Sequence, residues 1–326
     1  MKKHLLISTL FLILLCSNTK AQTTSVNSLF EKDSITVVIT DSGLGGLSVL
    51  AEMEKNMRNS GHFAKINLVF ANALFNETGG YNALTNRNEK VETFNMVLNG
   101  ISKKYKPDLI LIACNTLSTI YEETNFAKTA IIPIIGIVDI GVLEIKKKLD
   151  QNANSKVLIF GTETTIEEDS YRSQLVEQGI SNARIVSQAC PQLQNYIENN
   201  PLGEDTEILI MSYVDEALAK GTYPKDSIYA SLNCTHFGYS KKIWTEAFNY
   251  SEIEPLAIIN PNVQMAEILL NKKFENRFIN TAIDIHVVSK VNINDESVQS
   301  ISGILKEQSI AASLALINYQ KVLDLF

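Results

Sequence analysis

The chain has 326 residues, of which 45% are hydrophobic and 20% are charged, with 15 Gly and 7 Pro. This composition is typical of a globular protein of two ordinary domains, and it gives no sign of disorder or of a solenoid. The formal net charge of −7 leaves no basic excess that could displace counterions from a polyanion, so we exclude nucleic acid as a partner.

The N-terminus has the pattern of a secretory signal peptide. Residues 2–4 are Lys-Lys-His, residues 5–15 form an apolar run, and residues 17–21 are small and polar. The apolar run is too short to span a bilayer, so we expect cleavage after about Ala21, export to the periplasm or beyond, and a mature form without a membrane span. Cys16 follows a leucine where lipoprotein processing requires a small residue, so we expect no lipidation.

Apolar runs rich in β-branched residues alternate with helical periodicity along the rest of the chain. Each run is short, unbroken by charge and followed by a helix-like stretch, which predicts parallel strands covered by helices on both faces. The predicted strands are residues 35–40, 66–70, 109–113, 131–135, 156–160, 183–187 and 227–232. The fold class is therefore α/β and doubly wound, and the stretch after about residue 290 predicts amphipathic helices.

A weak internal repeat divides the mature chain into two halves. Each half contains a strand, a polar turn and a helix, and later a strand that ends in a cysteine, a polar pair and a helix. We therefore predict two similar α/β domains in a pseudo-symmetric arrangement. The first comprises residues 34–137 with about 260–326 and carries Cys114, and the second comprises 138–259 and carries Cys234. The two cysteines would face each other across the cleft between the domains.

The glycine-rich turn Gly43–Gly46 could in principle cradle a phosphate, because it lies between a predicted strand and a predicted helix. It lacks the G-x-G-x-x-G spacing and the lysine of a P-loop. We therefore interpret it as a tight strand-to-helix turn.

Two buried strands end in a thiol followed by small polar residues, in "LILIACNTLST" (109–119) and "IYASLNCTHFG" (228–238). A cysteine at the start of a helix lies near free N–H groups and the positive helix pole, which favour the thiolate. A lone cysteine in an apolar run is usually inert, but two in matched contexts indicate a functional pair. His236 can orient or protonate Cys234, and Asp41 can do the same for Cys114, although both could simply cap helices.

The odd number of cysteines in the mature chain, Cys114, Cys190 and Cys234, does not form a disulfide framework. Cys190 stands outside the two matched contexts. We expect it to pack in the core.

Six motifs follow one another over roughly residues 34–290: "DSGLGGLSVL" (41–50), "ACNT" (113–116), "IPIIGIV" (132–138), "GTETTI" (161–166), "ACPQLQNYIE" (189–198) and "NCTHFG" (233–238). In this order and spacing they resemble the glutamate racemases of the cofactor-independent aspartate/glutamate racemase superfamily. The resemblance implies inversion at the α-carbon of an amino acid by two cysteines, without a cofactor and without a metal.

The resemblance also implies roles for individual residues. Cys114 and Cys234 would be the two acid/base groups, because a single base would return its proton to the face it came from. Asp41 would assist Cys114, and His236 with Glu198 would assist Cys234. The implied contacts to the substrate are Asp41, Ser42, Asn115, Thr116, Thr164, Thr235 and His236.

One loop departs from the family pattern. Glutamate racemases carry Pro-Tyr-Gly after the second strand, whereas this chain has "ANALFNETGGYNALTNRNEKV", where the nearest match is Gly80, Tyr81 and Asn82. We place Tyr81 and Asn82 among the substrate contacts. Glutamate remains the first candidate substrate, followed by aspartate or another small dicarboxylate.

Two alternative functions stay open at this point. One is another superfamily chemistry, such as cis–trans isomerisation or decarboxylation, in which one cysteine acts alone. The other is a non-catalytic exported solute-binding protein, because two α/β lobes around a cleft also describe such receptors. The oligomeric state is not defined by the sequence, and a homodimer is one option.

Overall fold

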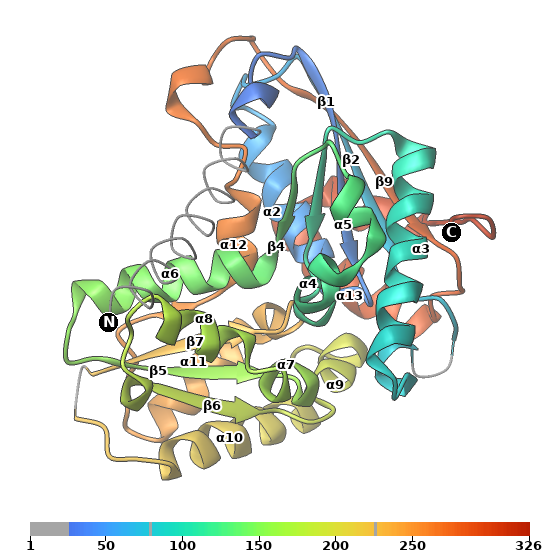
Figure 1. Ribbon diagram of the computed structural model, residues 1–326. Coiled ribbons are helices and arrows are strands. Elements are labelled where there is room, and N and C mark those ends of the chain that lie inside the picture. Colours follow the sequence, from blue (N-terminus) through green and yellow to red (C-terminus); the bar gives the residue numbers. More distant parts are fainter. Residues whose placement is uncertain (1–25, 78–79, 225–226) are drawn as a thin grey trace, which may run out of the picture.

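A computed structural model describes residues 26–77, 80–224 and 227–326, which form two lobes around two parallel sheets (Figure 1). The first sheet has the strand order β10-β9-β2-β1-β3-β4 and the second has the order β6-β5-β7-β8. The first sheet is built from β1 (Ser34–Asp41), β2 (Lys65–Asn72), β3 (Leu109–Ile112), β4 (Ile134–Gly136), β9 (Ala282–Ser289) and β10 (Gln320–Lys321). The second is built from β5 (Lys156–Gly161), β6 (Ile185–Ala189), β7 (Ile228–Asn233) and β8 (Ile258–Ile259). The predicted α/β class with two parallel sheets is confirmed.

Helices cover the faces of both sheets. Those attached to the first sheet are α2 (Leu47–Met57), α3 (Arg87–Tyr105), α4 (Asn115–Ile120), α5 (Asn125–Thr129), α12 (Pro261–Ala266), α13 (Asp295–Gln308) and α14 (Ile310–Ile317). Those attached to the second are α6 (Ile137–Gln151), α7 (Glu163–Glu167), α8 (Ser170–Glu177), α9 (Leu193–Asn199), α10 (Glu204–Ala219) and α11 (Lys241–Tyr250). In Figure 1, α6 runs along the junction between the lobes.

The central strands bury both faces, which explains why their sequences are continuously apolar. In β1, Val37 and Ile39 pack in the core on the α2 and α13 side, whereas Val38 packs on the α3 side. In β5, Leu158 and Val157 likewise lie in different cores. The cause is the two-residue period of a strand, which sends successive side chains to opposite faces.

All seven predicted strands are present, with ends that differ by up to three residues. The sequence-based prediction missed β9, which pairs along its whole length with β2. Asp284 and His286 interrupt its apolar pattern, because one face of β9 is exposed at those positions. It also missed β8 and β10, which have only two residues each. The predicted C-terminal helices are confirmed as α13 and α14.

The predicted domain boundaries remain a prediction, but the sheets follow a compatible division. The chain leaves the first sheet after β4, passes through β5 to β8, and returns to the first sheet at β9. The proposed signal peptide and Cys16 lie outside the described residues. Within the part that is described, no helix combines the length and the apolar character needed to cross a membrane.

Candidate active site

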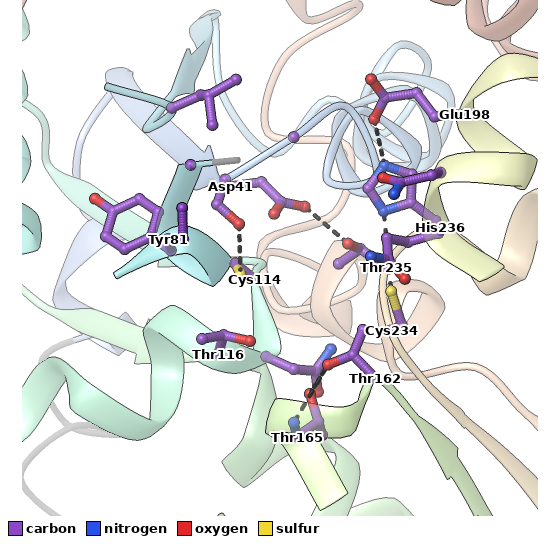
Figure 2. A pocket seen from close by; sticks show the side chains of 18 of the residues that line it. Asp41, Tyr81, Cys114, Thr116, Thr162, Thr165, Glu198, Cys234, Thr235 and His236 are labelled. Atoms are coloured by element: carbon purple, nitrogen blue, oxygen red, sulfur yellow. Dashed lines mark hydrogen bonds and ion pairs between the residues drawn. The ribbon is translucent and has the colours of Figure 1, made fainter. Parts of the chain in front are cut away.

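A cavity of about 560 Å³ lies where the carboxyl ends of strands from both sheets meet. Cys114 and Cys234 both line it and lie on opposite sides of the pocket in Figure 2. The other predicted site residues that line it are Asp41, Ser42, Tyr81, Asn115, Thr116, Glu198, Thr235 and His236. The chain therefore brings together residues from the end of β1, from the segments that follow β3 and β7, and from α9, which are far apart in the sequence.

Cys114 follows β3 directly and occupies the position before the first residue of α4. Its side chain is buried, and its Sγ lies 3.2 Å from Oγ of Ser42. Burial and the charge of Asp41 raise the pKa of the Cys114 thiol to about 12, although the contact with Ser42 favours the thiolate. The sequence-based expectation that the helix start favours a thiolate is therefore outweighed by burial and by a neighbouring carboxylate. A cationic group near the sulfur would be needed to form the thiolate at neutral pH.

Cys234 stands at one end of a chain of three polar side chains. Its Sγ lies 3.9 Å from Nδ1 of His236, and Nε2 of His236 lies 2.7 Å from Oε2 of Glu198 (Figure 2). Burial alone would lower the pKa of His236, but its contacts with Cys234 and Glu198 raise it well above the usual value. Burial would likewise raise the pKa of Glu198, but His236 lowers it. We infer that the two residues form a partly buried ion pair whose imidazolium faces the sulfur of Cys234.

Asp41 and Thr235 connect the two halves of the site. Oγ1 of Thr235 donates a hydrogen bond of 2.8 Å to Oδ2 of Asp41, and both residues are buried. Burial raises the pKa of Asp41, while the charge of His236 and the bond from Thr235 act in the opposite direction. Asp41 ends β1 and Thr235 follows β7, so this bond joins the ends of strands in different sheets.

The glycine turn between β1 and α2 packs directly against the segment that carries His236. A Cβ atom on Gly45 would lie 2.3 Å from Oγ1 of Thr235 and 2.8 Å from the backbone nitrogen of His236. Only glycine permits this approach. The backbone N–H of Leu44, in the same turn, donates a 3.3 Å hydrogen bond to Oε2 of Glu198. The prediction of a tight strand-to-helix turn is confirmed.

Polar side chains at the start of α4 form another wall, and Tyr171 of α8 supports one of them. Oδ1 of Asn115 accepts a 2.7 Å hydrogen bond from the hydroxyl of Tyr171, which fixes the orientation of the amide. Thr116 follows in the first turn of α4, and its buried side chain also lines the cavity. These residues offer hydrogen-bonding groups beside Cys114.

Thr164, one of the predicted substrate contacts, does not line the cavity, whereas two neighbouring threonines, Thr162 and Thr165, do. Thr162 caps α7 by accepting from the backbone N–H of Thr165, and the two hydroxyls lie 2.9 Å apart. The cap and the third helical residue share one face of the helix, whereas the intervening Thr164 points in another direction.

The loop after β2 reaches the Cys114 side of the cavity. Tyr81 lies there, with its side chain only 3% exposed and its ring packed edge-to-face on Phe75. Burial and the charge on Cys114 raise the pKa of Tyr81 well above the usual range. The backbone of Asn82 lies in the short 3₁₀ helix Gly80–Ala83, but its side chain lies outside what the structure describes.

Several polar residues of the lining were not among the predicted site residues. They are Asn76, Glu77, Thr162, Thr165, Gln192, Gln194 and Asn195. Gln192, Gln194 and Asn195 stand in the motif "ACPQLQNYIE" together with Glu198, so their place in the cavity could have been predicted from this motif. Of the described lining residues, none is Lys or Arg, so a substrate carboxylate would have to be bound by N–H and hydroxyl donors.

The described part of the chain contains no group of three or more His, Cys, Asp or Glu side chains that could hold a metal ion. The three cysteines in the described ranges are free. Cys190 is fully buried in the core, as predicted.

Comparisons with known proteins agree on one family. The family model for Asp/Glu/Hydantoin racemase matches residues 45–236. A glutamate racemase from Aquifex pyrophilus is 30% identical over 205 residues, covering 63% of this chain and 72% of that protein. One from Clostridium botulinum (strain Alaska E43 / Type E3) is 28% identical over 271 residues, covering 82% of this chain and 96% of that protein.

Solved structures show the same fold. The glutamate racemase from Francisella tularensis, solved in complex with D-glutamate, superposes with a TM-score of 0.63 at 19% identity, covering 84% of this chain and 94% of that one. A glutamate racemase isoform from Bacillus anthracis superposes with a TM-score of 0.62 at 21% identity, covering 89% of this chain and 96% of that one. The chain belongs to the Asp/Glu/hydantoin racemase family and is an isomerase of the glutamate racemase type.

Proposed function

We propose that this protein racemises an amino acid, with glutamate as the first candidate, by proton transfer between the α-carbon and the sulfurs of Cys114 and Cys234, without a cofactor. The observation that carries the proposal is that two thiols from different sheets line one cavity, each beside its own polar partners. The D-glutamate bound to the Francisella tularensis relative supports the choice of substrate.

The proton balance of the proposed reaction requires both sulfurs. One thiolate removes the α-proton and becomes a thiol, and the carbanionic centre then takes a proton from the other thiol on the opposite face. The product has the inverted configuration, and the two sulfurs have exchanged their protonation states. Proton exchange with water, or the reverse reaction, restores the starting state.

The polar groups of the site fit the charges that develop in this reaction. A substrate ammonium group would bring a positive charge close to Cys114, where burial and Asp41 otherwise disfavour the thiolate. The N–H groups of Asn115, Thr116 and Thr235 and the hydroxyl of Thr116 would bind the carboxylate and stabilise negative charge at the α-carbon. On the other side, the imidazolium of His236 would stabilise the thiolate of Cys234.

Aspartate or another small dicarboxylate is the second candidate substrate. The loop with Tyr81 differs from the Pro-Tyr-Gly loop that the resemblance leads us to expect, and it lines the cavity. A different loop at this position would change the depth of the pocket and therefore the length of side chain that it accepts.

We also propose that the protein works outside the cytoplasm, where it would interconvert free D- and L-amino acids released from the cell wall or present in the environment. Only the signal-peptide pattern at residues 1–21 supports this proposal. Cell fractionation with an antibody against the protein tests it, and recovery solely in the cytosolic fraction would contradict it.

The test of the reaction is incubation of the purified protein with L-glutamate, and separately with L-aspartate, in deuterated water. α-Proton exchange is followed by NMR and loss of optical activity by polarimetry. We expect both for the wild type, and no racemisation for Cys114→Ser or Cys234→Ser. Cys190→Ala is the matched control, because it removes a thiol from the core and not from the cavity. Tight binding of both amino acids without exchange would overturn the proposal.

A further inference from the structure

Tyr239 makes a contact between the two lobes that the proposed proton transfers do not use. It lies in the 3₁₀ turn Phe237–Ser240, three residues after His236, and its side chain is buried. Its hydroxyl donates a 2.9 Å hydrogen bond to the carbonyl oxygen of Leu44 and lies 3.3 Å from that of Gly45. Tyr239 therefore joins the second-lobe segment that carries Cys234 to the glycine turn of the first lobe.

The backbone of Leu44 is held at both of its polar groups by side chains of the second lobe. Its carbonyl accepts from Tyr239, and its N–H donates 3.3 Å to Oε2 of Glu198. The same carboxylate oxygen lies 2.7 Å from Nε2 of His236. A displacement of the Leu44 backbone would therefore change the contact with the carboxylate of Glu198, which is the partner of His236.

The turn also contacts the other cysteine. Ser42 stands two residues before Leu44, and its Oγ lies 3.2 Å from Sγ of Cys114. The segment Ser42–Leu44 thus contacts Cys114 through Ser42, and through Leu44 it contacts Glu198, the partner of His236. The Tyr239 hydroxyl donates a hydrogen bond to this segment from the opposite lobe.

We propose that Tyr239 is a positioning residue that holds the Leu44 peptide in place and thereby aligns the Glu198–His236 pair with Cys234 and the Ser42 hydroxyl with Cys114. This inference rests on the proposed two-cysteine racemisation. Tyr239 touches none of the reacting atoms in this scheme. Its ring packs edge-on against the ring of His236, and its hydroxyl acts through the turn.

The chemistry of the phenol suits a fixed donor. Burial, together with the charges of Asp41 and Glu198, raises the pKa of Tyr239 well above its usual range, so the hydroxyl stays protonated at any pH at which the protein works. Without this hydroxyl the buried Leu44 carbonyl keeps only the 3.2 Å hydrogen bond from the Leu47 N–H of its own lobe, and the bond that holds the turn to the second lobe is lost.

The effect on pH dependence has a definite sign. The Leu44 N–H is one of the contacts that lower the pKa of Glu198, and Glu198 in turn raises that of His236. If the peptide moves away, Glu198 loses this contact and its pKa rises. The pH range in which both groups are charged then narrows from its acidic side.

The test compares Tyr239→Phe with Tyr223→Phe. Tyr223 also donates its hydroxyl to a backbone carbonyl, that of Ala217 at 3.2 Å, but it lies outside the cavity lining. The substrate is L-glutamate or L-aspartate, whichever the wild type racemises faster. We expect Tyr239→Phe to lower kcat for this substrate at least tenfold and to change KM less than threefold. The plateau of its pH profile should narrow. We expect Tyr223→Phe to keep the wild-type kcat and profile.

Two further measurements keep the result interpretable. Each rate is divided by the folded fraction taken from the unfolding curve of the same variant, so that loss of stability is not counted as loss of alignment. In a Glu198→Gln background, where the Leu44 contact no longer controls a charged pair, Tyr239→Phe should lower kcat by a smaller factor than it does in the wild-type background, because only the effect on Ser42 and Cys114 is left.

Different outcomes separate this inference from the proposed function. If the wild type shows neither exchange nor racemisation, the proposed function falls and the inference with it. If the wild type racemises but Tyr239→Phe matches Tyr223→Phe in kcat and pH profile, or costs the same with and without Glu198→Gln, the positioning role alone is overturned.

Discussion

Gly45→Ala is expected to push apart the two segments that form the active site. The added methyl group would lie 2.3 Å from Oγ1 and 2.7 Å from Cβ of Thr235, and 2.8 Å from the backbone nitrogen of His236. Two of these three atoms belong to Thr235, whose hydroxyl is already bonded to Asp41, and the third belongs to the main chain. No flexible side-chain end is available to yield.

The size of the effect follows from these distances. Ordinary van der Waals contact begins at 3.4 Å, so the methyl group and the Thr235 hydroxyl must separate by about 1 Å. A misplacement of about 1 Å can cost roughly 100-fold in rate. Overpacking of this kind also costs about 1–3 kcal/mol in the free energy of unfolding.

The assay measures two quantities for each variant. The rate of α-proton exchange in deuterated water reports the alignment of the site, and urea unfolding followed by circular dichroism reports stability. Gly303→Ala is the matched control, because a Cβ on Gly303 meets nothing within 4 Å and the residue lies inside α13. We expect this control to keep the wild-type rate and to gain about 0.5–1 kcal/mol in stability, since alanine favours a helix over glycine.

An exchange rate within threefold of wild type in a Gly45→Ala variant that remains folded would contradict this prediction. That result would mean that the turn and the Thr235 segment can separate without disturbing the cysteines. A loss of rate that is fully explained by unfolding would also contradict it.

Three other predictions concern charge. Glu198→Gln should lower the pKa of His236, because the substitution removes a carboxylate that raises this pKa. NMR titration of the imidazole ring protons measures the shift, and an unchanged pKa would contradict the Glu198–His236 ion pair. Without added amino acid, alkylation of Cys114 by iodoacetamide should be slow at pH 7 and rise about tenfold per pH unit toward its pKa of about 12; a pH-independent rate would refute this. Folding raises the pKa of the Cys114 thiol from 9.0, so the contribution of this thiol to stability is fully present below pH 9 and is lost as the pH rises toward 12. The urea unfolding midpoints of wild type and Cys114→Ser should therefore converge over this pH range.

The sequence allowed the fold class and the main features of the cavity to be predicted because both depend on local patterns. Continuous apolar runs revealed the strands that are buried on both faces. β9 escaped the same criterion because its exposed face carries Asp284 and His286. Pattern reasoning therefore finds central strands more readily than strands with one open face.

Individual side chains were harder to predict than the segments that carry them. The motif at residues 161–166 was placed at the cavity, but helix geometry turns Thr162 and Thr165 toward it and Thr164 away. The raised pKa of Cys114 arises from burial and from Asp41, which is 73 residues distant in the sequence. The bond from Tyr239 to Leu44 joins two lobes, and no local pattern contains that information.

The most direct test uses the two variants Cys114→Ser and Cys234→Ser, each of which keeps one of the two cysteines of the cavity. It measures α-proton exchange with L-glutamate and, separately, with D-glutamate, or with the enantiomers of aspartate if that is the better substrate. With only one sulfur left, the proton leaves and returns on the same face. Cys114→Ser and Cys234→Ser should therefore each incorporate deuterium into one enantiomer, with configuration retained, and the two variants should act on opposite enantiomers. If either variant still racemises, or if both variants exchange the same enantiomer, Cys114 and Cys234 are not the two bases of this enzyme.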